Sequence, residues 1–209
     1  MLKQMKEMLR LQEILEVRIS GPNWRAQDHN HGLSIYMECA ELIGHTDWKH
    51  WKKQQEDPVA VTSELVDIWH FALAMALQEN MTAEDLVDLI KDCRIAKDCK
   101  PTLQDCVSTI GAYAVQEGGF AIANFVYACG LCGLGYDDLY KLYVCKNVLN
   151  TFRQNHGYKE GRYNKVCAGK EDNLHLYEVY NGFAGDIDAV ALYDALSTRH
   201  ALVNVHSLN

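Results

Sequence analysis

The sequence predicts an all-α fold, and three observations support that prediction. Apolar residues recur at the three- and four-residue spacing of helices along most of the chain. No run of alternating β-branched residues predicts a strand, and only three prolines interrupt the 209 residues. With 48% hydrophobic residues the chain can bury one sizeable core, so we expect residues 1–209 to form a single domain.

The first part of the chain predicts three helices. Residues 2–19 place apolar side chains on one stripe, and the polar segment "SGPNWRAQDHNHG" ends that helix. We expect a second helix over residues 33–52. Pro58 suits the first turn of a third helix, and the apolar pattern extends this helix over residues 58–79.

The remainder of the chain continues the helical pattern. Thr82 followed by Asp85 resembles a capping box and predicts the start of a fourth helix. The polar segment 157–173 contains three glycines and is expected to be a loop, with Gly157 ending the helix before it. We expect the last helix to be interrupted at residues 182–185. The expected helices cover residues 82–97, 102–117, 120–129, 136–157 and 174–202.

Charge and hydropathy exclude some classes of function. A formal net charge of -8 argues against a general nucleic-acid binder, whose affinity rests on many Lys and Arg side chains. No run approaches the roughly 18 apolar residues of a membrane span, and "MLKQMKEMLRLQEILE" alternates apolar and charged groups unlike a signal peptide. We therefore expect a cytoplasmic protein without nucleic-acid or membrane partners.

The eight cysteines are expected to be mostly reduced thiols, several of them buried. Zinc binding is the alternative for these cysteines. Cys129 and Cys132 form the one closely spaced pair in the chain, whereas a structural zinc site needs more than one tight ligand pair. This spacing favours thiols over a zinc site.

Two carboxylate pairs carry the strongest chemical signal. Glu38 and Glu41 are three positions apart on the second predicted helix, and Glu64 and Asp67 repeat this spacing on the third. Side chains at this spacing project from one face of a helix. If the two helices pack antiparallel, as the short connection between them suggests, all four carboxylates converge.

Converging carboxylates need a cation. Oxygen ligands without His or Cys at matching spacing favour a hard ion, Mg²⁺ or alternatively Mn²⁺, bound together with substrate phosphates. The alternative for either pair is an exposed helix face in contact with water. Apolar residues flank both pairs, in "IYMECAELI" and "SELVDIWHF", where an unpaired carboxylate would lose hydration. We therefore favour a metal site.

A basic cluster follows in the second half of the chain. Its members are Lys146, Arg153, Lys159, Arg162, Lys165 and Lys170. Lys146, Asn150 and Arg153 share one face of a predicted helix that leads into the glycine-containing loop. Arg and Lys beside such a loop suit a phosphate chain, and the alternative is a charged surface in contact with water. The acidic and basic clusters together predict a nucleoside triphosphate hydrolase.

Five segments carry a resemblance to a known family. They are "YMECAELI", "WKHWK", "ELVDIWHF", "KNVLNTFRQNHGYKEGRY" and "GKEDN", within residues 8–173. On these motifs the chain resembles the dimeric, all-α dUTPases, relatives of MazG-type NTP pyrophosphatases. The resemblance implies a four-helix-bundle core with additional helices and a homodimer. It also implies Mg²⁺-dependent cleavage of dUTP to dUMP and pyrophosphate, and to this we add dUDP as an expected second substrate.

The resemblance also implies roles for individual residues. Glu38, Glu41, Glu64 and Asp67 would hold the metal and serve catalysis, and which glutamate orients the attacking water is left open. Trp48 would lie near the base. The positions matching phosphate-binding or loop-closing residues are Lys146, Asn150, Arg153, Tyr158 and Lys165, and the basic cluster adds Lys159.

Base recognition departs from the family pattern. The first helix of the family commonly contains LQxxLN, whereas "LQEILE" here keeps Gln12 and has Glu16 in the Asn position. A carboxylate accepts hydrogen bonds and does not donate them, so Glu16 would accept from uracil N3–H or from the amino group of cytosine. The last motif has Cys167 and Ala168 in place of the family's usual Trp segment. Glu16 pointing to solvent is the alternative.

We therefore predict a dUTP diphosphatase whose base-binding residues are Gln12, Glu16 and Trp48. Two other functions remain open: a pyrophosphatase for dCTP or a modified pyrimidine deoxynucleotide, and a non-catalytic nucleotide-binding regulator. The four carboxylates argue against the regulator. The alternative for Trp48 is packing in the core or at an interface. We expect His70 to be a buried, hydrogen-bonded residue and not a metal ligand.

Overall fold

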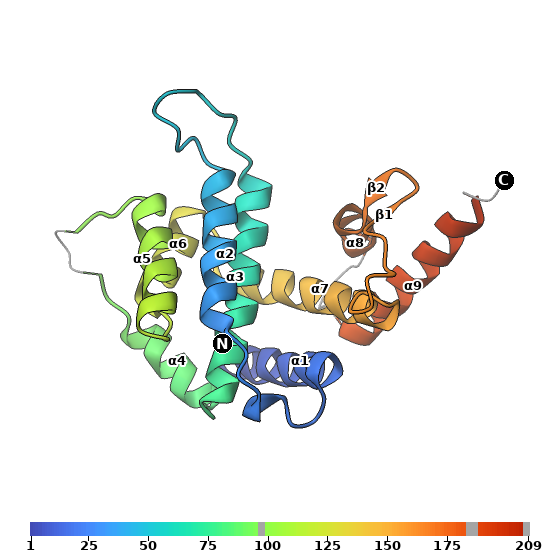
Figure 1. Ribbon diagram of the computed structural model, residues 1–209, viewed down its shortest axis with the longest axis horizontal. Coiled ribbons are helices and arrows are strands. Elements are labelled where there is room, and N and C mark those ends of the chain that lie inside the picture. The colour runs from blue at the N-terminus through green and yellow to red at the C-terminus, as the bar shows by residue number, and fades with distance from the viewer. Residues whose placement is uncertain (96–98, 183–187, 207–209) are drawn as a thin grey trace.

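Helices make up most of the fold, as the sequence predicts (Figure 1). The computed structural model describes residues 1–95, 99–182 and 188–206. The elements in chain order are α1 (Leu2–Ser20), a 3₁₀ turn (Trp24–Ala26), α2 (His31–Gly44), α3 (Pro58–Gln78), α4 (Ala83–Asp92), α5 (Leu103–Gln116), α6 (Ile122–Leu131), α7 (Tyr136–Asn155), β1 (Val166–Cys167), β2 (Lys170–Glu171), α8 (Asp172–Tyr180) and α9 (Ala189–His206). The two strands pair antiparallel as a short hairpin.

Four helices, α1, α2, α3 and α7, pack against one another where the predicted site residues lie. Figure 1 shows α2 and α3 side by side, with α1 and α7 crossing them near one end. On its other side α2 packs closely against α5. A Cβ atom on Gly32 would lie 2.3 Å from the carbonyl oxygen of Ala114, so this close approach requires glycine. The α2–α3 pair is therefore held firmly from both sides.

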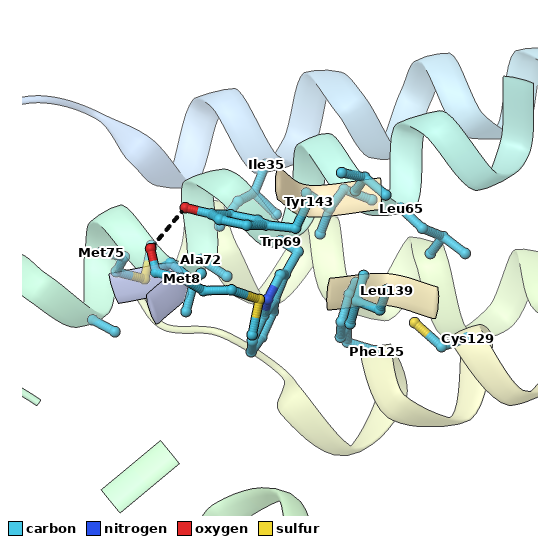
Figure 2. Close-up of a cluster of buried hydrophobic side chains, with 14 of the residues drawn as sticks. Met8, Ile35, Leu65, Trp69, Ala72, Met75, Phe125, Cys129, Leu139 and Tyr143 are labelled. Atoms are coloured by element: carbon cyan, nitrogen blue, oxygen red, sulfur yellow. Dashed lines mark hydrogen bonds between the residues drawn. The ribbon is translucent and has the colours of Figure 1, made fainter. Parts of the chain in front are cut away.

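The main hydrophobic core is formed by buried side chains from α1 to α7. Trp69 of α3 stacks on Phe125 of α6, with 5.1 Å between ring centroids and 10° between ring planes. Tyr143 of α7 is fully buried, and its hydroxyl oxygen lies within hydrogen-bonding distance of the carbonyl oxygen of Met8, at 3.0 Å (Figure 2). Burying a large apolar side chain stabilises a fold by about 1.5–3 kcal/mol. These contacts fix α7 relative to α1 and α3.

A second hydrophobic cluster lies between the C-terminal half of α7 and the helices α8 and α9. Its buried residues are Cys145, Val148, Leu149, Phe152, Leu176, Leu192 and Leu196. Because α7 also contributes Tyr143 to the main core, one continuous helix joins the two clusters. The formation of a single domain by residues 1–209 stays a prediction.

The structure corrects the end of the second predicted helix. α2 ends at Gly44 instead of residue 52, and residues 45–57 form a loop that projects beyond α2 and α3 (Figure 1). The loop is closed by the backbone N–H of Asp57, which donates to the carbonyl oxygen of His45 at 3.0 Å. The Asp57 side chain also caps α3, whose first residue is Pro58. Because Asp57 and Pro58 begin a new helix, the chain has to turn back before them, and α2 cannot continue to residue 52.

The fourth helix begins as predicted and ends earlier. Thr82 and Asp85 form a reciprocal capping box at the start of α4. The helix ends at Asp92, because Cys93 already has an extended conformation, with φ -55° and ψ 127°. Residues 96–98 of the expected helix lie outside the described residues.

The C-terminal part differs from the prediction in detail. α7 ends at Asn155, and Gly157 has φ 87°, the left-handed conformation expected after a helix. The expected loop contains the β1–β2 hairpin, and α8 begins at Asp172, two residues before the predicted start. Of the expected interruption at residues 182–185, only Gly182 lies within the described residues.

α3 has the length and hydropathy of a membrane-spanning helix, although the sequence predicts no such span. Its most apolar window is 61% buried inside the protein, and the helix carries Glu64 and Asp67. A central helix of a protein core has the same properties, so length and composition alone are weak support for a membrane span.

Candidate active site

A pocket of about 440 Å³ lies between α1, α2, α3, α7 and the segment that leads into α8. Its volume falls within the range of small-molecule sites. Eleven of the predicted site residues line it: Gln12, Glu16, Glu38, Glu41, Glu64, Asp67, Lys146, Asn150, Arg153, Tyr158 and Lys165. Trp48 and Lys159 are not among the lining residues that the structure describes. The fold therefore brings the carboxylates, the basic residues and the first helix together.

The acidic wall of the pocket consists of Glu38 and Glu41 from α2 and Glu64 and Asp67 from α3. Carboxylate oxygens of Glu38, Glu41 and Glu64 lie within 4.8 Å of one another. The three-residue spacing puts each pair on one helix face, and the packing of α2 on α3 makes these faces meet. Asp67 has a different partner, since its Oδ2 atom lies 2.7 Å from Nζ of Lys146.

Burial makes three carboxylates of the acidic wall, Glu38, Glu64 and Asp67, resist ionisation. Burial first, and then the nearby Asp67 and Glu64, raise the pKa of Glu38 to about 8. Burial also raises the pKa of Glu64 and that of Asp67, although the Lys146 ammonium opposes both rises. A cation among these oxygens would favour the ionised carboxylates instead. The set of hard oxygen ligands therefore fits a divalent ion.

The basic wall of the pocket consists of Lys146, Asn150 and Arg153 from α7 and Lys165 from the following loop. Lys146 reaches across to α3, where Nζ also lies 3.5 Å from the hydroxyl oxygen of Ser63. The Asn150 side-chain oxygen accepts a hydrogen bond from Nη1 of Arg153 at 3.3 Å. The two walls therefore face each other across the pocket, joined by the ion pair of Lys146 with the acidic wall.

Arg153 is buried, with only 7% of its surface exposed. Its Nε and Nη2 atoms donate to the two carboxylate oxygens of Asp172, each at 2.8 Å. Burial lowers the pKa of Arg153, but the hydrogen bonds and negative charge of Asp172 raise it, and the net direction is upward. The guanidinium therefore stays charged at the edge of the pocket.

The loop after α7 brings Tyr158 to the basic wall. The Arg153 guanidinium lies 5.9 Å from the centre of the Tyr158 ring, and Nζ of Lys165 lies 5.6 Å from it. Lys159 turns toward α1, where its ammonium donates to the carbonyl oxygen of Ile19. A phosphate-binding role for Lys159 stays a prediction.

The end of the pocket beside α1 contains a buried hydrogen-bond network. The Oε1 atom of Gln12 accepts from the Tyr143 hydroxyl at 2.8 Å and lies 2.9 Å from Nδ1 of His70. Nε2 of Gln12 donates to Oε1 of Glu16 at 2.9 Å. His70 is buried and hydrogen-bonded through Nδ1 as predicted, but its buried Nε2 has no hydrogen-bond partner among the described residues, and burial lowers its pKa to about 3.

Glu16 belongs to this network. Only 6% of its surface is exposed, so the alternative that it points to solvent is wrong. Burial raises the pKa of Glu16, while the hydrogen bond from Gln12 opposes the rise. The Glu16 carboxylate is therefore a partly desolvated hydrogen-bond acceptor at this end of the pocket.

Trp48 lies apart from the pocket, on the loop 45–57. Its side chain is 43% exposed and meets Trp51 edge to face, with 5.4 Å between ring centroids. Nζ of Lys49 lies 5.4 Å from the centre of the Trp48 ring. A base-binding role for Trp48 stays a prediction.

Sequence reasoning assigned no role to several residues at the site. The lining residues of this kind include Leu15, Ile19, Ser63, Phe71, Gln154 and Asn173. Asn173 closes the segment "GKEDN", whose polar residues after a glycine are a signal that could have identified it. Ser63 and Phe71 carry no such signal, because they reach the pocket only through their place beside Glu64 and His70 on α3.

Comparison with known proteins identifies the family. A family model described as dUTPase matches residues 4–158, from α1 to the loop after α7. A comparison with curated proteins gave no match. The matched residues contain the acidic wall and the α7 part of the basic wall, and the helical structure agrees with the resemblance seen in the sequence. Because the match spans well over half of the sequence, the chain belongs to the dUTPase family and is a dUTP diphosphatase.

Proposed function

We propose that this dUTP diphosphatase uses Mg²⁺ held by the acidic wall, with Mn²⁺ as the alternative ion. The family generally depends on a divalent metal ion. The observation that carries the proposal is the grouping of oxygens from Glu38, Glu41 and Glu64 within 4.8 Å. Carboxylate oxygens are the ligands that Mg²⁺ prefers, and burial together with the neighbouring carboxylates raises the pKa of Glu38, a rise that a bound cation would oppose.

Hydrolysis of dUTP to dUMP and pyrophosphate breaks the link between the α- and β-phosphates. Bound at the acidic wall, the metal ion would polarise phosphoryl oxygens and lower the pKa of a water molecule. A carboxylate of the acidic wall orients the attacking water and accepts its proton. The same link is present in dUDP, so we propose dUDP as a second substrate.

The phosphate chain lies along the basic wall in this proposal. Lys146 and Arg153 supply positive charge, and Asn150 supplies an amide donor at the same face of α7. Tyr158 and Lys165 approach from the loop, and Lys159 closes the loop toward α1. The positions of the first five side chains around one pocket support this assignment.

Substitution of Glu41 tests the metal site. In Glu41→Gln we expect Mg²⁺-dependent dUTP turnover to fall by about a thousandfold or more, since transition-state charge is no longer neutralised. The circular dichroism of the helices should be unchanged. Glu79→Gln, at the exposed end of α3, is a matched control that should keep full activity. An active Glu41→Gln enzyme would refute the assignment.

A second candidate substrate is dCTP, and the buried carboxylate of Glu16 is the observation that favours it. The ionised Glu16 can accept from uracil N3–H or from the cytosine amino group, while Nε2 of Gln12 can donate to the adjacent atom of either base. Rates with dUTP, dCTP, dTTP and dATP separate the candidates. We expect dUTP to be preferred, and a higher kcat/KM for dCTP would replace it as the principal substrate.

We also propose that the enzyme is a cytoplasmic homodimer. The exposed apolar side chains of Leu33, Tyr36 and Met37 on one face of α2 support a contact with a second copy. The eight cysteines, all within the described residues, form no disulfide, which supports the proposal of a reducing compartment. Sedimentation equilibrium should give twice the chain mass, and a monomer at micromolar concentration would contradict the dimer.

A further inference from the structure

The guanidinium of Arg153 has two hydrogen-bonding edges, and the structure gives them different partners. Its Nε/Nη2 edge is taken up by the carboxylate of Asp172, with both donor–acceptor distances at 2.8 Å. On the other edge Nη1 donates to Asn150 at 3.3 Å. Each terminal nitrogen carries a further N–H, so this second edge can still donate to another acceptor. Arg153 lines the pocket, and an edge of this shape matches two oxygens of a phosphate group.

Asp172 contacts Arg153 from outside the pocket lining. It is 5% exposed and is not among the described residues that line the pocket. Besides the two bonds from Arg153, its Oδ2 atom accepts from the hydroxyl of Tyr163 at 3.0 Å. Burial alone would raise the pKa of Asp172, but the hydrogen bonds and charge of Arg153 hold it below its ordinary value.

The backbone of Asp172 also holds the second cation of the loop. Its N–H donates to the carbonyl oxygen of Lys165 at 2.8 Å, where the chain enters the β1–β2 hairpin. Lys165 and Arg153 both approach the ring of Tyr158, as described above. One residue at the start of α8 therefore fixes one pocket cation through its side chain and another through its backbone.

We propose that Asp172 is a positioning residue for dUTP hydrolysis, holding Arg153 and Lys165 so that their free N–H groups face the phosphate chain. The proposal rests on the proposed phosphate-binding role of the basic wall. Asp172 lies beyond residues 4–158, so the C-terminal segment contributes to the enzyme's catalytic arrangement outside the family match. If the Arg153–Asp172 ion pair were purely structural, its loss would instead weaken the binding of the base and of the phosphate chain equally.

Asp172→Asn keeps the shape of the side chain and removes its charge. We expect affinity for α,β-imido-dUTP in the presence of Mg²⁺ to fall by about 10- to 100-fold, because hydrogen bonds to charged groups are worth roughly 1.5–3 kcal/mol. Deoxyuridine, which has no phosphate, should bind within twofold of wild type. Calorimetry measures both affinities, and kcat/KM for dUTP should fall in parallel with the analogue affinity.

Glu178→Gln is the matched control on the same helix. It removes exposed ion pairs with Lys170 and Arg199 and does not touch Arg153, so both affinities should stay at the wild-type value. If Asp172→Asn does not fold, Tyr163→Phe removes one hydrogen bond to Asp172 and keeps the ion pair. We then expect a loss of about two- to fivefold, again restricted to the analogue.

Two results would overturn the proposal. One is unchanged analogue affinity in Asp172→Asn, or in Tyr163→Phe if only that variant folds. The other is an equal loss of deoxyuridine affinity, which would mark a general structural role. The proposed function is tested separately by the wild-type enzyme, because failure of wild type to hydrolyse dUTP with Mg²⁺ would refute that function whatever the variants bind.

Discussion

The acidic wall and the Arg153–Asp172 pair both bury charge beside the same pocket, but with opposite electrostatic consequences. Glu38 and Glu64 have raised pKa values because burial and neighbouring carboxylates disfavour their ionised forms. Asp172 has a lowered pKa because a cation bonds to it through both oxygens. In the first region the Lys146 ammonium pairs with Asp67 and leaves the other carboxylates with raised pKa values, while in the second region each charge has its partner.

This difference in electrostatics separates carboxylates suited to bind an ion from an ion pair suited to hold side chains in place. Carboxylates that are unstable beside one another form a good site for a divalent ion, since binding relieves their repulsion. A balanced buried pair gains nothing from a ligand and instead keeps its members in one orientation. The dUTP diphosphatase thus combines an acidic wall in which carboxylates repel one another with a basic wall in which Asp172 holds Arg153 in place.

The largest expected effect on stability comes from breaking the Arg153–Asp172 ion pair. Arg153→Met should lower the free energy of unfolding by about 3–5 kcal/mol, because it leaves the buried Asp172 without its partner. Glu64→Gln should leave the metal-free protein as stable as wild type or more stable, because it removes the repulsion between Glu64 and the neighbouring carboxylates of Glu38 and Asp67. Urea unfolding without metal measures both variants.

A double variant sharpens the test. Arg153→Met combined with Asp172→Leu should recover most of the lost stability, since no unpaired charge remains buried. If Glu64→Gln destabilises the metal-free protein as much as Arg153→Met does, the two regions do not differ as described.

The next effect is the pH dependence of stability without metal. The pKa of Glu38 rises from 4.5 in the unfolded chain to about 8 in the fold, so its stabilising contribution is complete below pH 4.5 and is lost as the pH rises through 8. Burial lowers the pKa of His31 to about 4 and of His70 to about 3, which makes stability fall below pH 6.5 instead. Between pH 6.5 and 8 the histidine effect has ended, and stability falls as Glu38 ionises, with the raised pKa values of Glu64 and Asp67 acting in the same direction.

Over that interval the metal-free protein should lose about 1 kcal/mol after screening by solvent, a fall in Tm of roughly 2–4 °C. Thermal unfolding followed by circular dichroism measures the change. Saturating Mg²⁺ should abolish the slope, and Glu38→Gln should flatten it without metal. A Tm that rises between pH 6.5 and 8 in metal-free wild type would contradict this account.

The smallest expected effect lies outside both regions. Trp48→Ala should change the KM for dUTP by less than about twofold and stability by less than about 0.5 kcal/mol, since the side chain is exposed and does not line the pocket. Steady-state kinetics checks the first value and urea unfolding the second. A tenfold rise in KM would support the base-binding role predicted from the family resemblance.

Local spacing was sufficient to predict the acidic wall. Glu38 with Glu41 and Glu64 with Asp67 lie on single helix faces whatever else the chain does, because the helical repeat places them there. Lys146, Asn150 and Arg153 follow the same rule on α7. Such predictions hold even when the predicted ends of a helix are wrong by several residues.

Contacts between distant segments were not predictable from spacing. The loop 45–57 replaced the end of an expected helix because Asp57 and Pro58 start α3 afresh. Glu16 is buried because α1 packs against α3 and α7, and nothing in "LQEILE" distinguishes a buried carboxylate from an exposed one.

The sequence by itself determined the all-α fold, the helix faces and the family, because periodicity and short motifs are local properties of the chain. The tertiary structure decided which of those faces meet. Arg153 and Asp172 are 19 positions apart and become partners only when the hairpin and α8 fold back on α7. Burial then decides their energetics, since a charge removed from water is stable only beside its partner. Glu38, Glu64 and Asp67, which were visible in the sequence, acquire their raised pKa values from the same kind of burial.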